Sequence, residues 1–117
     1  MKKFDSILID KDNNLFEIVD GTKGKYELSS IKKISILNED ANFKGKTEPF
    51  LHQILGGASF FIVGEPKLFV GLKIITNDDK ILAVYISKNA ILFNSEKYQK
   101  DIKEAKKIAH LLENKQR

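Results

Sequence analysis

The chain contains no cysteine, only two prolines among its 117 residues, and no long apolar run. Without cysteine there can be no disulfide, no thiolate nucleophile and no cysteine-based zinc site, and this composition fits a reducing compartment. The longest apolar stretch, residues 54–63, is interrupted by Gly56, Gly57 and Ser59 and falls far short of the roughly 20 residues of a membrane span. Met1-Lys2-Lys3 is not followed by the apolar run of a signal peptide. We therefore expect a cytoplasmic protein.

The rest of the composition is that of an ordinary globular chain, with 42% hydrophobic and 31% charged residues. This length favours one domain, spanning residues 1–117. The net charge is +4, and its basic residues concentrate in the C-terminal segment from residue 94 onward. A net charge of this size concerns solubility more than nucleic-acid binding, so no nucleic acid is expected as a partner.

Residues 4–93 show the alternation and the turn signals of β-strands. Two β-prone runs, 4–10 and 15–20, flank a polar connection and predict a hairpin. Over residues 25–37 the alternation slips by one residue between Leu28 and Ile31, which requires a bulge or a short break.

The clearest β-signal is the pair of runs 67–76 and 80–87, which predicts a hairpin around Asn77-Asp78-Asp79. One face of this hairpin is continuously apolar. The opposite face also carries large side chains, namely Phe69, Ile75, Ile81 and Tyr85. We therefore expect another part of the chain to cover the second face.

The C-terminal segment predicts an amphipathic helix over about residues 95–113, and we expect this helix to be the cover. Its apolar residues recur at spacings of three and four: Tyr98, Ile102, Ala105, Ala109 and Leu112. Its solvent stripe is a candidate basic face for anionic lipid or nucleic acid, formed by Lys97, Lys100, Lys103 and Lys107. Asp101 and Glu104 interleave with the lysines, which favours a solvated face instead.

Residues 38–57 break the rhythm and predict a long irregular connection. Connections of this length are often functional. One interpretation makes residues 42–64 a contact surface, with candidate binding residues Phe50, His52, Phe60 and Phe61. The other makes the connection structural, covering the end of a barrel and burying Phe43, Phe50 and Leu51.

No catalytic motif, cofactor site or metal site is predicted. Gly45-Lys46-Thr47 matches the end of a P-loop, but Asp40 occupies the position of its first glycine, so we interpret the triplet as a surface turn. The spacing of His52 and His110 matches no metal motif. The carboxylate pairs Glu39-Asp40 and Asp78-Asp79 are assigned to turns, where such residues cap the backbone.

The order of antiparallel strands followed by one C-terminal helix resembles the pleckstrin-homology-like (PH-like) barrel. Four stretches also resemble small uncharacterised proteins of Gram-positive bacteria and their mobile elements: "NEDANFKGKTEPFLHQILGG", "FVGLKI", "LAVYIS" and "FNSEKYQKDIKEA". The PH-like resemblance implies binding rather than catalysis. Some PH-like domains bind lipid headgroups through basic residues of the first hairpin loop, but here residues 10–14 hold one lysine against two aspartates.

We therefore expect an α+β, mostly β fold, with about seven antiparallel strands in a PH-like curled sheet or barrel capped by one C-terminal amphipathic helix. The favoured function is a non-enzymatic protein-interaction module that binds an unknown protein partner or itself. One alternative is peripheral binding to anionic membranes or headgroups through the basic helix. The other, less favoured, is a small enzyme using His52.

Overall fold

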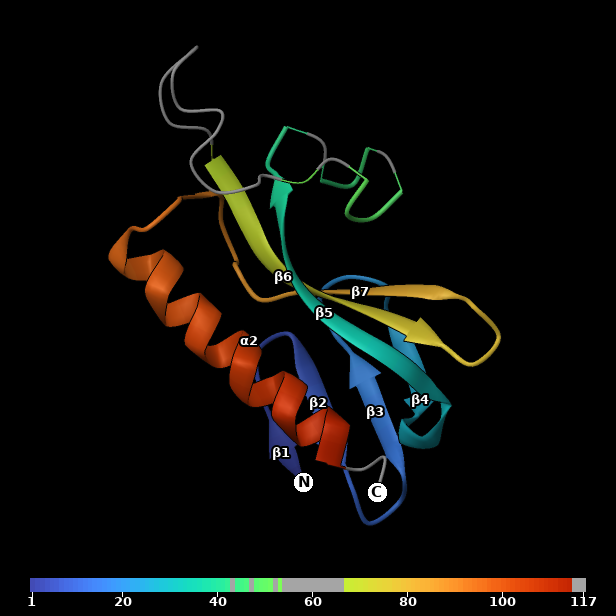
Figure 1. The fold of residues 1–117 in the computed structure, drawn as a ribbon. Coiled ribbons are helices and arrows are strands. Elements are labelled where there is room, and N and C mark those ends of the chain that lie inside the picture. The colour runs from blue at the N-terminus through green and yellow to red at the C-terminus, as the bar shows by residue number, and fades with distance from the viewer. Residues whose placement is uncertain (43, 47, 52, 54–66, 115–117) are drawn as a thin grey trace.

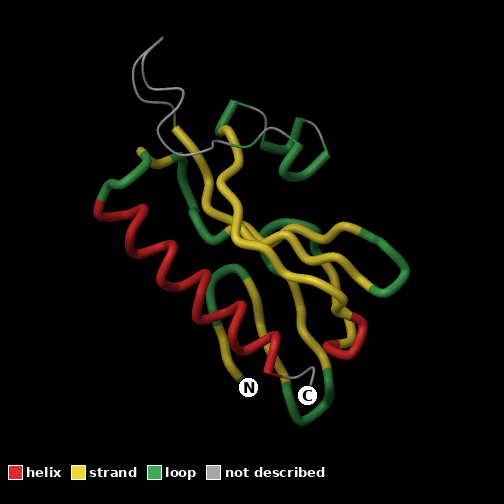
Figure 2. Tube along the Cα trace, viewed as in Figure 1, coloured by secondary structure: helices red, strands yellow, loops and turns green. Residues whose placement is uncertain are grey.

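The computed structural model describes residues 1–42, 44–46, 48–51, 53 and 67–114. These residues form an α+β, mostly β fold with two antiparallel sheets and one C-terminal helix, as the sequence predicts (Figures 1 and 2). The elements are β1 (Lys2–Lys3), β2 (Ile7–Asp10), β3 (Leu15–Ile18), β4 (Gly24–Glu27), a 3-10 turn (Leu28–Ser30), β5 (Ile31–Asp40), β6 (Lys67–Thr76), β7 (Ile81–Tyr85), β8 (Ile91–Leu92) and α2 (Glu96–Asn114).

The first sheet has the strand order β1-β2-β3-β4. Its β2–β3 hairpin confirms the predicted one, with Asp10 opposite Leu15. The side chain of Asn13 donates a 2.8 Å hydrogen bond to the Asp10 carboxylate across the turn. Asn14 takes a left-handed backbone conformation with φ 59°, which asparagine tolerates better than most residues.

The second sheet has the strand order β5-β6-β7, and β8 pairs with β6 beyond the end of β7. The β6–β7 hairpin is the one predicted around residues 77–79, with Ile75 opposite Ile81. The predicted slip before β5 is also present. The 3-10 turn at Leu28–Ser30 breaks the strand, and a register shift follows between Ile31 and Lys33.

The predicted connection over residues 38–57 begins too early, because β5 continues to Asp40. Glu39 and Asp40 lie opposite Phe69 and Leu68 of β6, so they are strand residues rather than turn residues. The sequence misleads here because three polar residues in a row, Asn38-Glu39-Asp40, carry a turn signal. Pairing with the apolar strand β6 overrides that local preference.

The main core lies between the two sheets and α2, all of which belong to one cluster of buried side chains. The second sheet contributes the face that carries Leu68, Val70, Leu72 and Ile74, and α2 contributes Ala105, Ile108 and Leu112. In Figure 1, α2 runs along one side of the molecule, past strands of both sheets. The helix therefore covers the first face of the β6–β7 hairpin, and the prediction that it covers the second face is wrong.

A second, smaller cluster covers part of the opposite face of the second sheet. It contains Phe50, Ala83 and Tyr85, with Leu37 and Phe69 packed against them. The segment after β5 provides this cover through Phe50, whereas α2 packs against the other face. The sequence identified the need for a cover but assigned it to the wrong segment.

The two sheets do not close into a barrel. Among the described residues, one isolated bridge between Gly21 and Val84 joins them, and backbone hydrogen bonds from Thr22 to Ala83 and from Tyr85 to Asp20 support it. Within the same residues, no helix is long and apolar enough to cross a membrane.

Candidate functional site

A buried carboxylate anchors the segment after β5 to the second sheet. Glu39 is 0% exposed. One of its oxygens, Oε1, accepts a 2.5 Å hydrogen bond from the Tyr85 hydroxyl, and the other, Oε2, accepts a 2.9 Å bond from the backbone N–H of Phe50. Buried polar groups are stable only when they are paired in this way. Glu39 therefore ties Phe50 to the sheet.

The ring of Phe50 lies over Gly71 of β6. A Cβ atom placed on Gly71 would come within 2.7 Å of Cζ of this ring and 2.9 Å of the Val84 carbonyl oxygen. Phe50 itself has φ 63°, a left-handed conformation that is rare for a bulky residue. Ring burial and the bond to Glu39 stabilise this conformation, which costs about 1–3 kcal/mol.

Lys44 adds a cation to the outside of the same cluster. Its Nζ lies 4.6 Å from the ring centroids of both Phe69 and Tyr85 and 4.0 Å from the Asp20 carboxylate. Burial, together with the hydrogen bond to Glu39, raises the pKa of Tyr85 far above that of a free tyrosine. The phenol therefore remains a hydrogen-bond donor across the physiological pH range.

This cluster of Glu39, Lys44, Phe50, Phe69 and Tyr85 has a structural role. Both oxygens of Glu39 are bound, and Phe50 fills the space above Gly71. A surface depression of about 290 Å³ lies beside it, lined in part by Asp20, Lys23 and Lys44. Within the described part of the chain, no three histidine or acidic side chains gather as they would around a metal ion.

The structure places the candidate binding residues only in part. Phe50 is 2% exposed, so its ring contacts the sheet and not solvent. Leu51, which the structural interpretation of the loop would bury, is 60% exposed. His52, Phe60 and Phe61, as well as Phe43, lie outside the described residues.

β5 is the longest edge strand among the described residues. β5 is the first strand in the order β5-β6-β7, so one of its edges faces β6 and the other has no strand beside it among the described residues. An isolated bridge between Glu39 and Gln53 occupies only the last part of that edge. Within the described part of the chain, no strand lies beside residues 32–38 on that side.

The other edge strands are shorter or are protected. β1 has two residues, both lysine, and β4 has four residues that include Lys25 and Glu27. The Gly21–Val84 bridge covers part of the edge of β7. Short, charged or covered edges resist pairing with another chain. β5 has ten residues, and its central stretch Ile34–Leu37 carries no charge.

Helix α2 lies next to this edge and contributes apolar side chains. The Asn38 side chain donates a 3.2 Å hydrogen bond to the Tyr98 hydroxyl, which fixes this side of α2 near β5. Ile102 lies one helical turn further along the same side. We use the name β5–α2 border for the half-buried apolar residues of this region, which are Ile34, Ile36, Tyr98 and Ile102.

Beside the β5–α2 border, one side-chain atom of Asn38 has no hydrogen-bond partner among the described residues. Its Oδ1 is buried and makes no hydrogen bond within the described residues. Rotating the amide would exchange the two atoms and leave the nitrogen unpaired instead. Such groups are few in folded proteins, and they often mark a strained or functional position.

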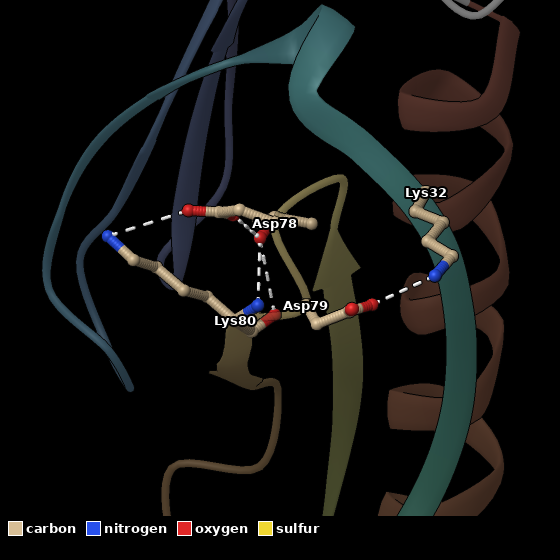
Figure 3. Close-up of polar contacts among 5 residues, drawn as sticks. Lys32, Asp78, Asp79 and Lys80 are labelled. Carbon is tan, nitrogen blue, oxygen red and sulfur yellow. Dashed lines mark hydrogen bonds and ion pairs between the residues drawn. The ribbon is translucent and has the colours of Figure 1, made fainter.

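The N-terminal end of β5 is held in place by the tip of the β6–β7 hairpin. Figure 3 shows Lys32 of β5 reaching Asp79, at 2.8 Å, and Lys80 beside Asp78. A hydrogen bond from the Thr76 hydroxyl holds the pKa of Asp78 below its usual value. These exposed ion pairs contribute little stability, but they show that Lys32 lies near the hairpin tip.

The opposite side of α2 carries charges of both signs. Lys97, Lys100, Lys103 and Lys107 are all exposed, as the sequence predicts. Lys97 and Lys100 line a depression of about 260 Å³ together with Asp5, Asp101 and Glu104. Ser87 donates a 2.8 Å hydrogen bond to Asp101, which fixes this side of the helix to the end of β7. Lys97 and Lys100 therefore lie among acidic groups, whereas Nζ of Lys107 lies 5.9 Å from the ring centroid of Phe4.

Sequence reasoning missed both the anchor and the edge. Glu39 lies two residues after Leu37 in a strand, so it shares a face with Leu37 and, in the next strand, with Phe69. This alternation is the sequence signal that could have predicted that Glu39 faces the same side of the sheet as Leu37 and Phe69. The exposure of the β5 edge follows from the strand order, which no local pattern contains.

No known protein-family model, curated protein or solved structure matches this chain.

Proposed function

We propose that this protein is a non-enzymatic, PH-like protein-interaction module that binds an extended segment of a partner protein along the outer edge of β5. The strand order supports the PH-like assignment, because a sheet of four consecutive strands precedes a second sheet and a C-terminal helix. The observation that carries the binding proposal is the outer edge of β5, which has no neighbouring strand over residues 32–38 among the residues that the structure describes.

An edge of this kind binds a partner by adding a strand to the sheet. The main-chain hydrogen bonds of the added strand provide affinity, and pockets or apolar surface beside the edge select its side chains. The β5–α2 border supplies such surface on one side of the edge. Alternate side chains of the added strand would face α2, and we expect them to be apolar.

Photo-crosslinking tests this proposal. A photo-crosslinking amino acid replaces Ser35, at the centre of the edge, and in a second protein it replaces Lys46, an exposed turn residue outside β5. We expect cells that express the first protein to yield a discrete crosslinked adduct that the second does not yield. Equal adduct patterns from the two positions would refute binding at β5.

The four exposed lysines of α2 support a second proposal, peripheral binding to anionic membranes. Such binding would weaken steeply as salt is added. The test measures protein binding at low salt to vesicles that contain about one third phosphatidylserine. It compares the wild type with the double variant Lys97→Glu, Lys103→Glu. Absence of wild-type binding, or equal binding by the variant, would exclude it.

A further inference from the structure

We propose that Phe69, Tyr85 and Asp20 form a binding site for a small trimethylammonium compound, which competes with the side chain of Lys44 for the same place. Binding at this site is independent of strand addition at β5. The site is identified by the Lys44 ammonium, whose Nζ lies 4.6 Å from the ring centroids of both Phe69 and Tyr85. Aromatic faces attract a cation at such distances.

The two rings form a corner around the ammonium. Their planes stand at 76° to each other, with the centroids 6.4 Å apart, and the ammonium of Lys44 lies at the same distance from both. A carboxylate oxygen of Asp20 lies 4.0 Å from the ammonium. Aromatic walls of this kind recognise quaternary ammonium ligands in other proteins, and the carboxylate adds a charge of the opposite sign.

The walls of the site are held by the strands, whereas Lys44 lies in a turn after β5. Phe69 belongs to β6, and Tyr85 ends β7 with its hydroxyl bound to the buried Glu39. The backbone carbonyl of Asp20 accepts a 3.0 Å hydrogen bond from the Tyr85 N–H, which places Asp20 beside this wall. We therefore expect the corner to keep its shape when the lysine side chain leaves it.

The site suits a cation that has no N–H groups. A lysine ammonium carries three donors, but aromatic faces are weak acceptors, and 4.0 Å is too long for a hydrogen bond to Asp20. The Lys44 side chain is only 27% exposed, which limits its access to water. A trimethylammonium group has no donors to leave unpaired, so it gains the attraction of the rings without this loss.

A surface depression beside the corner gives such a ligand room to enter. It has a volume of about 290 Å³ and is lined in part by Asp20, Lys44 and Tyr85. This volume is slightly below the range of about 300–1,000 Å³ for drug-sized ligands, so it favours a small compound. Because a tethered group acts at an effective concentration of about millimolar, we expect Lys44 to weaken ligand binding and its removal to strengthen it.

Titration with choline chloride tests the site. NMR at constant ionic strength follows the shift of the choline N-methyl signal, which moves when these groups lie over aromatic rings. We expect the wild type to bind weakly and the Lys44→Ala variant to bind at least tenfold more tightly. Lys46→Ala removes an exposed lysine of the same turn and should bind like the wild type. The neutral analogue of choline, in which carbon replaces the ammonium nitrogen, should not bind.

Two further variants, made together with Lys44→Ala, assign binding to the walls. Phe69→Leu removes one ring, and Asp20→Asn removes the charge while keeping the side-chain shape. Each should weaken choline binding at least fivefold, and melting temperatures verify that the variants are folded. Equal binding by both variants and Lys44→Ala would place choline elsewhere and overturn the proposal.

Three other results would also overturn it: no choline binding by Lys44→Ala, equal binding of choline by Lys44→Ala and the wild type, or equal binding of the neutral analogue. Phosphatidylcholine vesicles carry the same group on a lipid. Binding to these vesicles without binding of choline would identify a membrane ligand and contradict a small-molecule site.

Discussion

Removing the carboxylate of Glu39 should cost the protein a large share of its stability. The Glu39→Ala variant leaves the Tyr85 hydroxyl and the Phe50 N–H without their acceptor in a buried site. Each orphaned donor costs about 1–3 kcal/mol. The carboxylate itself no longer has to be desolvated, which offsets part of that cost. We expect a net loss of about 3 kcal/mol, against the roughly 5–15 kcal/mol typical of a whole domain.

Urea unfolding followed by circular dichroism measures this loss. For a chain of this length, about 3 kcal/mol corresponds to a fall in melting temperature of about 12 °C. The Glu39→Gln variant is the matched comparison. Its side-chain oxygen can accept from Phe50 while its amide donates to the Tyr85 oxygen, so it should lose less than half as much.

A double-mutant cycle identifies the partner. Combining Glu39→Ala with Tyr85→Phe should show a coupling of at least about 1 kcal/mol, since residues in one hydrogen-bond network are not additive. Glu27→Ala, at an exposed carboxylate on β4, should change stability by less than about 0.5 kcal/mol. If Glu39→Ala behaved like this surface control, Glu39 would not anchor the loop and our description of the second cluster would be wrong.

Three further predictions concern neighbouring sites. Gly71→Ala should destabilise the protein by about 1–3 kcal/mol in thermal unfolding, because the new methyl group displaces the Phe50 ring or strains the backbone; unchanged stability would mean that the ring does not lie over Gly71. The folded protein holds the Tyr85 proton more tightly than the unfolded chain does, so this residue's contribution is complete below pH about 10 and is lost as pH rises further. Wild type should therefore lose stability above that pH more steeply than Tyr85→Phe. Parallel curves of stability against pH for the two proteins would show that ionisation of Tyr85 is not responsible for the loss. Burial and the charges of Asp101 and Asp5 raise the pKa of Glu104, so its ionisation disfavours folding at neutral pH. Glu104→Gln should melt at a higher temperature than wild type at pH 7, with the gap closing in acid, and a gap that does not depend on pH would refute this.

The sequence predicts those parts of the fold that local signals encode. Alternation and turn residues are enough for both hairpins, because they fix register over a few residues. Spacings of three and four locate α2 within a residue or two at each end. The break before β5 was also predicted, since the slip at Ser29-Ser30 is visible in the alternation.

The predictions that were wrong concern features that depend on contacts between distant segments. Whether α2 or the loop covers a given face of the second sheet depends on how the sheets pack, and both faces are apolar enough to accept either. Glu39 resembles a turn residue by its neighbours and becomes a buried anchor only because Tyr85 and Phe50 converge on it. The exposed edge of β5 is a property of strand order, which arises only after the chain has folded.

Amide hydrogen exchange along β5 is the most direct test of the claim that its outer edge binds a strand. When a strand adds to this edge, alternate amides between Lys32 and Asn38 gain hydrogen-bond acceptors, while the amides that already face β6 do not change. We predict that binding of the partner strand slows exchange at the outward amides at least tenfold. Exchange that stays fast at these amides in the associated state, with protection appearing on another element, would contradict the account.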